Sequence, residues 1–97
     1  MSTADTVQKY RSKTRIFADI LHAVQEDGDA KVTHILYKAN LSHDRLTKYL
    51  GQLEESGLLQ RASDGDKTTY RITNEGTKFL TEFHRMKEFL GAFGLDV

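Results

Sequence analysis

One stretch, residues 40–57, carries a helix start, an apolar stripe and a helix stop together, and it constrains the fold more than any other part of the chain. Ser42 can accept hydrogen bonds from the first free amides of a helix, and Gly57 can adopt the left-handed conformation that ends one. Between them leucines recur at helical spacing, at Leu46, Leu50 and Leu53. The pattern predicts a helix over residues 42–56 with one face in a core and the other free to meet a partner.

The segments before this helix predict two further helices. Ser12 can cap a first helix that Gly28 ends, and residues 29–32 then form an extended segment or a small strand. Thr33 can cap a second, short helix, which ends in a turn at residues 40–41. Apolar residues keep helical spacing in both helices, at Ile16, Phe17, Ile20, Leu21 and Val24 and then at Ile35, Leu36 and Ala39.

After Gly57 the periodicity changes from helical to alternating, which predicts two strands. Residues 58–62 and 68–72 form the strands, and residues 63–67, which include Asp64-Gly65, have the composition of a hairpin turn. The alternation directs Leu59, Tyr70 and Ile72 inward. It leaves Arg61, Thr69 and Arg71 more exposed.

A last helix begins at Thr73, which can cap it, and Glu75 suits the positive end of its dipole. Its apolar residues follow a heptad-like stripe, at Phe79, Phe83, Met86, Leu90 and Phe93. The first part of this stripe can cover the domain core, whereas the part after Met86 projects beyond it and predicts dimerisation. The alternative is that the whole helix folds back on its own domain.

These elements predict one mostly α-helical domain with a small β-hairpin, because 97 residues suffice for a single modest core. Their order is helix, short strand, helix, helix, strand, wing, strand and helix, which is that of a winged helix-turn-helix. We expect three parts: a flexible basic tail at residues 1–10, the winged-helix domain at residues 11–76 and a C-terminal dimerisation helix at residues 77–97.

Two motifs resemble a known family. Residues 35–42 read Ile-Leu-Tyr-Lys-Ala-Asn-Leu-Ser and are followed by Leu46, Tyr49-Leu50 and Gly57-Leu58-Leu59. This pattern resembles the archaeal winged-helix regulators that pair through a C-terminal antiparallel coiled coil. Residues 70–76, with Phe79-Leu80, resemble the strand-to-helix junction of that family and of many other winged helices. The match covers about residues 13–90 and implies a DNA-binding homodimer with a transcriptional or nucleoid role.

The charges are balanced overall but unevenly distributed. The net charge is zero and the pI is near 6.9, so bulk positive charge does not favour nucleic acid. Residues 9–15, however, contain four basic residues and no acid, and residues 31–52 hold four more against Asp44 alone. A neutral total can therefore hide one basic face.

A helix in the major groove reads base edges, while basic side chains, hydroxyls and backbone amides hold the phosphates. Lys48 can contact guanine or phosphate, Gln52 adenine, and Thr47 a phosphate or a thymine methyl. The predicted DNA-binding residues are Ser42, His43, Arg45, Thr47, Lys48, Gln52, Lys31, Lys38, Lys67, Arg11 and Lys13. The alternatives are a solvated helix face, a wing that serves only as a turn and a basic run that aids solubility.

The residues of this chain do not favour an enzyme. There is no cysteine, the four histidines have no metal-ligand spacing, and there is no glycine-rich phosphate loop, so we expect neither catalysis nor a metal or cofactor. No apolar run is long enough to span a membrane. We expect a cytoplasmic, nucleoid-associated protein.

Two functions compete on this basis. The first is a homodimer that binds double-stranded DNA with residues 42–56 in the major groove, as a transcriptional regulator. The second is a winged-helix protein-interaction module that uses its aromatic C-terminal helix for another partner, which would suit the neutral net charge. A ligand pocket at a dimer interface also stays open.

Overall fold

The computed structural model describes residues 11–97, and the predicted basic tail at residues 1–10 lies outside the described residues. The described chain is mostly helical with a small antiparallel sheet, which confirms the predicted fold class and element order. Its elements are α2 (Lys13–Asp27), β1 (Ala30–Lys31), α3 (Val32–Ala39), α4 (His43–Glu55), β2 (Leu59–Asp64), β3 (Lys67–Ile72) and α5 (Asn74–Gly91).

Three of the four predicted helix caps are confirmed. The hydroxyls of Ser12, Ser42 and Thr73 each accept a hydrogen bond from the backbone amide three residues further along, at 3.0, 3.3 and 3.0 Å. The fourth cap, Thr33, is wrong, because the N-cap of α3 is Lys31, two residues earlier, and Lys31 makes no side-chain capping bond. Lys31 is held in extended backbone by its place in β1, so the sheet sets the start of this helix.

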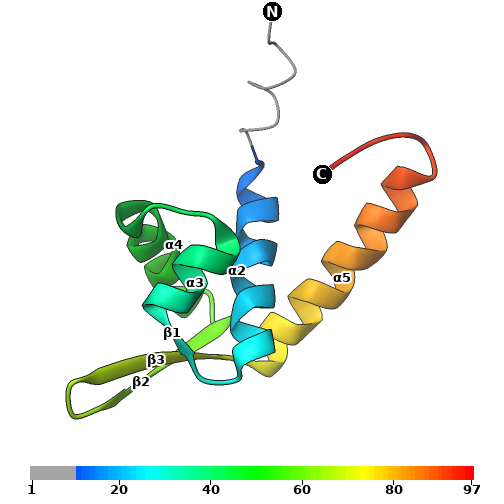
Figure 1. Cartoon of the computed structure of the whole chain (residues 1–97). Helices are drawn as coiled ribbons and strands as arrows, with labels where there is room; N and C mark the ends of the chain where they lie inside the picture. The colour runs from blue at the N-terminus through cyan, green and yellow to red at the C-terminus, as the bar shows by residue number, and fades with distance from the viewer. Residues whose placement is uncertain (1–10) are drawn as a thin grey trace, which may run out of the picture.

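The sheet has the strand order β1-β3-β2, and both pairings are antiparallel. The hairpin is longer than predicted, because Asp64 pairs with Lys67 and only Gly65 and Asp66 form the loop. Gly65 has φ +63°, which a two-residue hairpin loop requires and glycine adopts without strain. The tip of the hairpin extends away from the helices as a wing (Figure 1).

The core lies around α2, which packs against α3, α5 and the sheet. The predicted stripe of α4 is confirmed, since Leu46, Leu50 and Leu53 are all buried. Leu59 and Tyr70 are buried from the hairpin, as predicted. Burial of these apolar side chains supplies the main favourable free energy of folding and fixes α4 to the body of the domain.

The helix α5 is buried only over its first half. Leu80 and Phe83 are buried, whereas Met86 and Phe89 are 41 and 65% exposed. The second half runs away from the rest of the domain and diverges from α2 (Figure 1). The helix ends at Gly91, so the predicted helix to residue 97 is too long and Phe93 follows the helix instead of continuing its stripe.

Candidate nucleic-acid interface

The turn between α3 and α4 sets the direction of the predicted recognition helix. Asn40 adopts the left-handed conformation there, with φ 55° and ψ 58°, which asparagine tolerates better than most residues. The side chain of Arg11 closes this turn: its guanidinium donates to the carbonyl oxygens of Ala39 at 2.7 Å and Asn40 at 2.9 Å. The same guanidinium forms an ion pair with Asp19 of α2 at 2.8 Å.

Arg11 therefore has a structural role that the sequence did not indicate. It joins the start of α2 to the C-terminal end of α3, where free carbonyl oxygens need hydrogen-bond donors. Contact between Arg11 and DNA stays a prediction, but its guanidinium is already shared among three acceptors in this structure.

The outward face of α4 carries most of the predicted base-reading residues. Lys48 is exposed and forms no ion pair within residues 11–97. The hydroxyl of Thr47 is exposed but donates to the carbonyl of His43 at 2.9 Å, which leaves it free only to accept. Gln52 is half-buried, and its amide oxygen is buried without a hydrogen-bond partner, so this oxygen is turned away from the outward face.

A basic and aromatic cluster joins α2 to α4. The rings of Phe17 and Tyr49 meet edge to face with their centroids 5.7 Å apart. The ammonium of Lys13 lies 5.5 Å from the ring centre of Phe17, and the guanidinium of Arg45 lies 5.9 Å from that of Tyr49. These distances are within the range of cation–π attraction.

The positive charges of this cluster lower the pKa of Tyr49. The Arg45 guanidinium lowers the pKa of the Tyr49 phenol below its ordinary value, against a smaller opposing effect of desolvation. Lys48 and Lys13 lower this pKa further through their charges. Three basic side chains from two helices therefore act on one point of the surface. We call Lys13, Arg45, Lys48 and Tyr49 the basic cluster.

Tyr49 was not among the predicted contact residues. Its signal in the sequence is the four-residue spacing from Arg45, matched by the same spacing of Lys13 and Phe17 on α2. Tyr37 on α3 also lies outside the core, because this residue is 88% exposed. It lies beside Leu36, Asn40 and Leu41 on the same side as the turn.

Lys38, another predicted contact, has its charge engaged within the domain. Its ammonium lies 2.9 Å from Asp27 and 3.3 Å from Glu26, at the end of α2. The hydrogen bond to Asp27 raises the pKa of Lys38, and the reciprocal bond, together with one from His34, lowers the pKa of Asp27. Contact between Lys38 and DNA stays a prediction, but two carboxylates compete with a phosphate for this ammonium.

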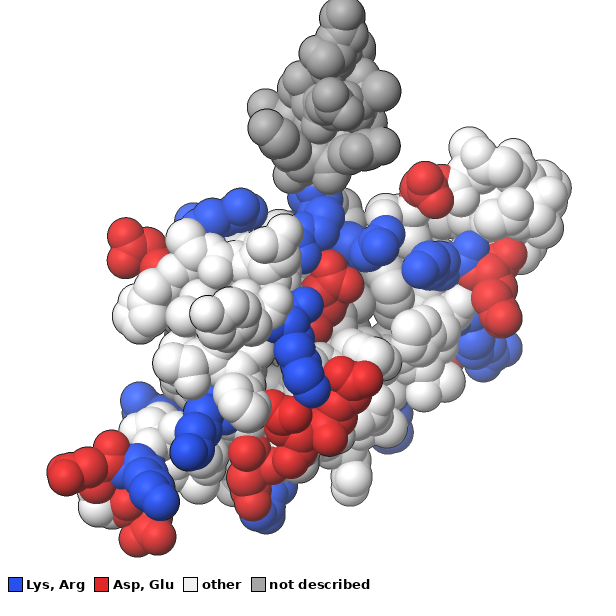
Figure 2. Space-filling view, viewed as in Figure 1, with Lys and Arg blue, Asp and Glu red and all other residues white. Residues whose placement is uncertain are grey.

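The wing carries both signs of charge, and Figure 2 shows them mixed at its tip. Arg61 pairs with Glu54 at 3.5 Å, and Arg71 pairs with Asp29 at 2.8 Å. Lys67 is exposed and has no ion pair within the described residues, although Asp64 lies opposite it in the hairpin. Of the basic residues of the wing that the sequence singled out, Lys67 is thus the most available for a phosphate.

The remaining predicted contacts lie at the N-terminal ends of α3 and α4. Ser42 is the N-cap of α4 and His43 is its first residue, and both are exposed. Lys31 is exposed at the N-cap of α3. The N-terminus of α4 presents backbone amides and a positive dipole end, which favour an anion.

Residues 11–97 contain no group of three or more histidine and acidic side chains close enough to hold a metal ion. Within the same residues, no helix is long and apolar enough to cross a membrane.

Comparison with known proteins connects this geometry to a family. A family model described as winged helix-turn-helix matches residues 10–91. An uncharacterized protein of Methanocaldococcus jannaschii, MJ0287, is 27% identical over 82 residues, which cover 84% of this chain and 79% of that protein.

Two solved structures extend the comparison. Sso10a-2, a DNA-binding protein from Sulfolobus solfataricus, superimposes with a TM-score of 0.74 at 29% identity, covering 87% of this chain and 90% of that one. A MarR family protein from Bacillus stearothermophilus superimposes with a TM-score of 0.66 at 21% identity, covering 92% of this chain and 64% of that one. The second likeness concerns the fold alone.

Proposed function

Because the chain belongs to the winged helix-turn-helix family, we propose that it is a homodimeric transcription regulator that binds double-stranded DNA with α4 in the major groove. The similarity to Sso10a-2, which is described as a DNA-binding protein, supports this proposal over nearly the full length of both chains. Binding to chromosomal DNA would make the protein nucleoid-associated.

The observation that carries the proposal is the basic cluster. Lys13, Arg45 and Lys48 are exposed and gather around Tyr49 at the outer side of α4, although the chain as a whole has no net charge. In DNA-binding proteins such side chains neutralise phosphates and release condensed counterions, which drives binding. A helix flanked by phosphate contacts can then present its outward residues to base edges.

In this proposal the basic cluster and the residues around it have distinct roles. The backbone amides at the capped start of α4 donate to a phosphate, with Ser42 and His43 beside it. Arg45 and Lys13 hold the flanking backbone, while Lys48 and Thr47 face the groove. The wing adds a contact through Lys67.

The proposed homodimer would form through α5. An apolar groove of about 540 Å³ runs beside this helix and is lined in part by Leu58, Phe79, Phe83 and Met86. The exposed apolar residues beyond Met86 continue the surface along the projecting half of the helix. A second copy packed in antiparallel orientation would cover it and set the distance between the two copies of α4.

Fluorescence anisotropy with labelled duplex DNA tests the DNA-binding proposal. The wild type should bind at low salt, and its affinity should fall steeply as salt rises from 50 to 200 mM, as expected when several phosphates are contacted. Lys48→Gln should weaken binding about fivefold and reduce the salt slope by about one. Arg85→Gln, which removes one positive charge from an exposed position on α5, is the matched control and should bind like the wild type.

Two results would contradict the proposal. Absence of binding at 50 mM salt would remove the DNA function itself. Equal loss of affinity in Lys48→Gln and Arg85→Gln would show that the charge of the whole protein matters and that α4 does not contact DNA.

A protein-interaction module is the second candidate, and the exposed apolar residues of α5 favour it together with the zero net charge. Sedimentation equilibrium distinguishes self-association through α5 from binding of a different protein. A dimer at micromolar concentration supports self-association, whereas a monomer supports a different partner for α5.

A further inference from the structure

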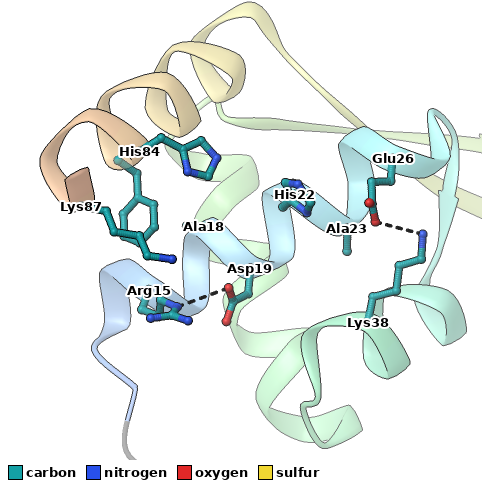
Figure 3. A pocket seen from close by; sticks show the side chains of 10 residues that line it. Arg15, Ala18, Asp19, His22, Ala23, Glu26, Lys38, His84 and Lys87 are labelled. Carbon is teal, nitrogen blue, oxygen red and sulfur yellow. Dashed lines mark hydrogen bonds and ion pairs between the residues drawn. The ribbon is translucent and has the colours of Figure 1, made fainter. Parts of the chain in front are cut away.

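A polar cleft of about 210 Å³ lies between α2 and α5, with one lining residue from α3 (Figure 3). It is on the side of α2 where the two long helices diverge (Figure 1). The side chains that give it its chemistry are Arg15, Asp19, His22, Glu26, Lys38, His84 and Lys87. None of these residues belongs to the basic cluster.

Both carboxylates of the cleft are already paired with basic side chains. Asp19 lies between two arginines, with Arg11 at 2.8 Å and Arg15 at 3.6 Å. Glu26 accepts from the ammonium of Lys38 at 3.3 Å. Each acid of the cleft therefore has a cationic partner before any group from α5 is counted, with Lys38 shared between Glu26 and Asp27.

The groups that α5 adds are nitrogen donors without partners. The ammonium of Lys87 extends towards Ala18 and Arg15 in Figure 3, and it forms no ion pair with any carboxylate of residues 11–97. His84 faces His22 of α2 edge to face, with ring centroids 6.4 Å apart. Neither imidazole has a hydrogen-bond partner within the described chain.

We propose that this cleft binds a small anion, a carboxylate or a phosphate, between Arg15, Lys87, His22 and His84. An anion there would accept hydrogen bonds from α2 and α5 together and would offset the repulsion between the like charges of Arg15 and Lys87. The volume accommodates an ion such as phosphate or a small polycarboxylate.

Occupancy would affect how α5 is held, because the same anion contacts both helices. It would fix the second half of α5 closer to α2 and so set the angle at which the helix is presented. The consequence for DNA rests on the proposed function, since only a dimer through α5 would convert this angle into the spacing of two recognition helices. Binding of the anion itself does not depend on it.

Isothermal titration calorimetry with sodium phosphate and with sodium citrate, at constant ionic strength in sodium chloride, tests the site directly. Both anions should bind with a stoichiometry of one per chain. Lys87→Gln and His84→Gln should each raise the dissociation constant at least about threefold, the scale of one partly exposed charged contact. Arg85→Gln, two residues from Lys87 on the same helix, is the matched control and should bind like the wild type.

Sulfate provides an independent test of the histidines. Sulfate keeps two negative charges from pH 8 to pH 6, whereas histidine side chains gain positive charge over this range. Its affinity should therefore rise as the pH falls, and this rise should be smaller in a His22→Gln, His84→Gln double variant. The other charged groups that face the two rings are Arg15, Asp19, Glu26, Lys38 and Lys87, and they are present in both proteins.

The outcomes are separable. Absence of binding by phosphate, citrate and sulfate, or binding that Lys87→Gln and His84→Gln leave unchanged, would overturn the anion site whatever the protein does with DNA. Binding of citrate but not phosphate identifies a carboxylate as the ligand class, and the reverse identifies a phosphate. Circular dichroism of each variant checks that it is folded, so that a loss of binding can be assigned to the site.

Discussion

The two helices that present outward faces, α4 and α5, use similar sequence patterns in opposite ways. Both begin at a hydroxyl cap, and both carry apolar residues at helical spacing. In α4 all three stripe leucines are buried, and what remains outside is polar or charged. In α5 the apolar residues continue beyond the part of the helix that packs on the core, so that Met86 and Phe89 are exposed to water.

The two outward surfaces differ in whether their exposure to water costs free energy. The polar side chains on the outward face of α4 are hydrated in the free protein. A ligand that displaces this water must replace its hydrogen bonds with polar contacts of its own. Exposure of the apolar side chains of α5 to water costs free energy. Burial of these side chains against a partner therefore favours association without any specific polar contact.

Gly76→Ala should destabilise the domain by about 3 kcal/mol, because the added methyl has no room. A Cβ at this position would collide with the carbonyl oxygen of Leu58 and would lie 2.6 Å from Cγ1 of Ile72. The first turn of α5 would have to separate from the strands, and the whole helix would shift. Urea denaturation gives the change in the free energy of unfolding.

Gly91→Ala is the matched control at the other end of α5. Nothing lies within 4 Å of a Cβ there, and alanine favours helix over glycine by up to about 1 kcal/mol. This variant should be equally stable or slightly more stable. Equal destabilisation by both substitutions would show that the two ends of α5 are packed alike.

Met86→Glu with Leu90→Glu should raise the dissociation constant of the proposed dimer about 100-fold or more, because two charges would have to be buried without partners. Phe83 is unsuitable for this test, although it belongs to the predicted stripe, since it is buried in the core of its own chain. Thr81→Glu with Arg85→Glu places two acids at other exposed positions of the same helix and should leave the dimer intact. Sedimentation equilibrium measures both. A double variant at Met86 and Leu90 that dimerises normally would place the interface elsewhere.

Lys13→Gln should weaken DNA binding about threefold and lower the salt slope by about one, because one phosphate contact is removed. Lys38→Gln should change the affinity less than about twofold, since this ammonium already pairs with Asp27 and Glu26. The two substitutions remove the same charge from neighbouring parts of the domain, and anisotropy titrations compare them directly. The opposite order of effects would mean that the α3 side, and not the basic cluster, meets DNA.

Much of the fold follows from the sequence because its signals are local. The caps at Ser12, Ser42 and Thr73 and the left-handed Gly57 lie where the residue types indicate them. Thr33 is not the cap because the pairing of β1 with β3, which is distant in sequence, holds Lys31 in extended backbone and starts α3 two residues earlier. The length of the wing likewise depends on cross-strand pairs that alternation alone does not fix.

The candidate site was less predictable, because it depends on which charges are paired in space. Arg11 and Lys38 look like free cations in the sequence, but their partners lie 8 or more residues away along the chain, in other turns or elements. Tyr49 was overlooked because its importance comes from Lys13 and Arg45 on two different helices. The sequence identifies the basic residues. Only the folded structure shows which of them pair with a carboxylate and which remain available to contact a phosphate.

Asp27→Asn should cause the smallest effect, and its sign depends on pH. Hydrogen bonds from Lys38 and His34 lower the pKa of Asp27 in the folded state, so its ionised form stabilises the fold above the unfolded-state pKa, near 3.8. This contribution is lost as the pH falls through the lower folded-state pKa. The wild type should therefore have the higher urea midpoint at pH 7, and the two midpoints should converge as the pH falls through the folded-state pKa of Asp27. Asp66→Asn, at the tip of the wing and without an ion pair within residues 11–97, should shift the pH 7 midpoint less. Because Asp27 links α2 to α3 through Lys38 and His34, an equal midpoint at pH 7 would mean that these two ion pairs contribute nothing to the stability of the fold.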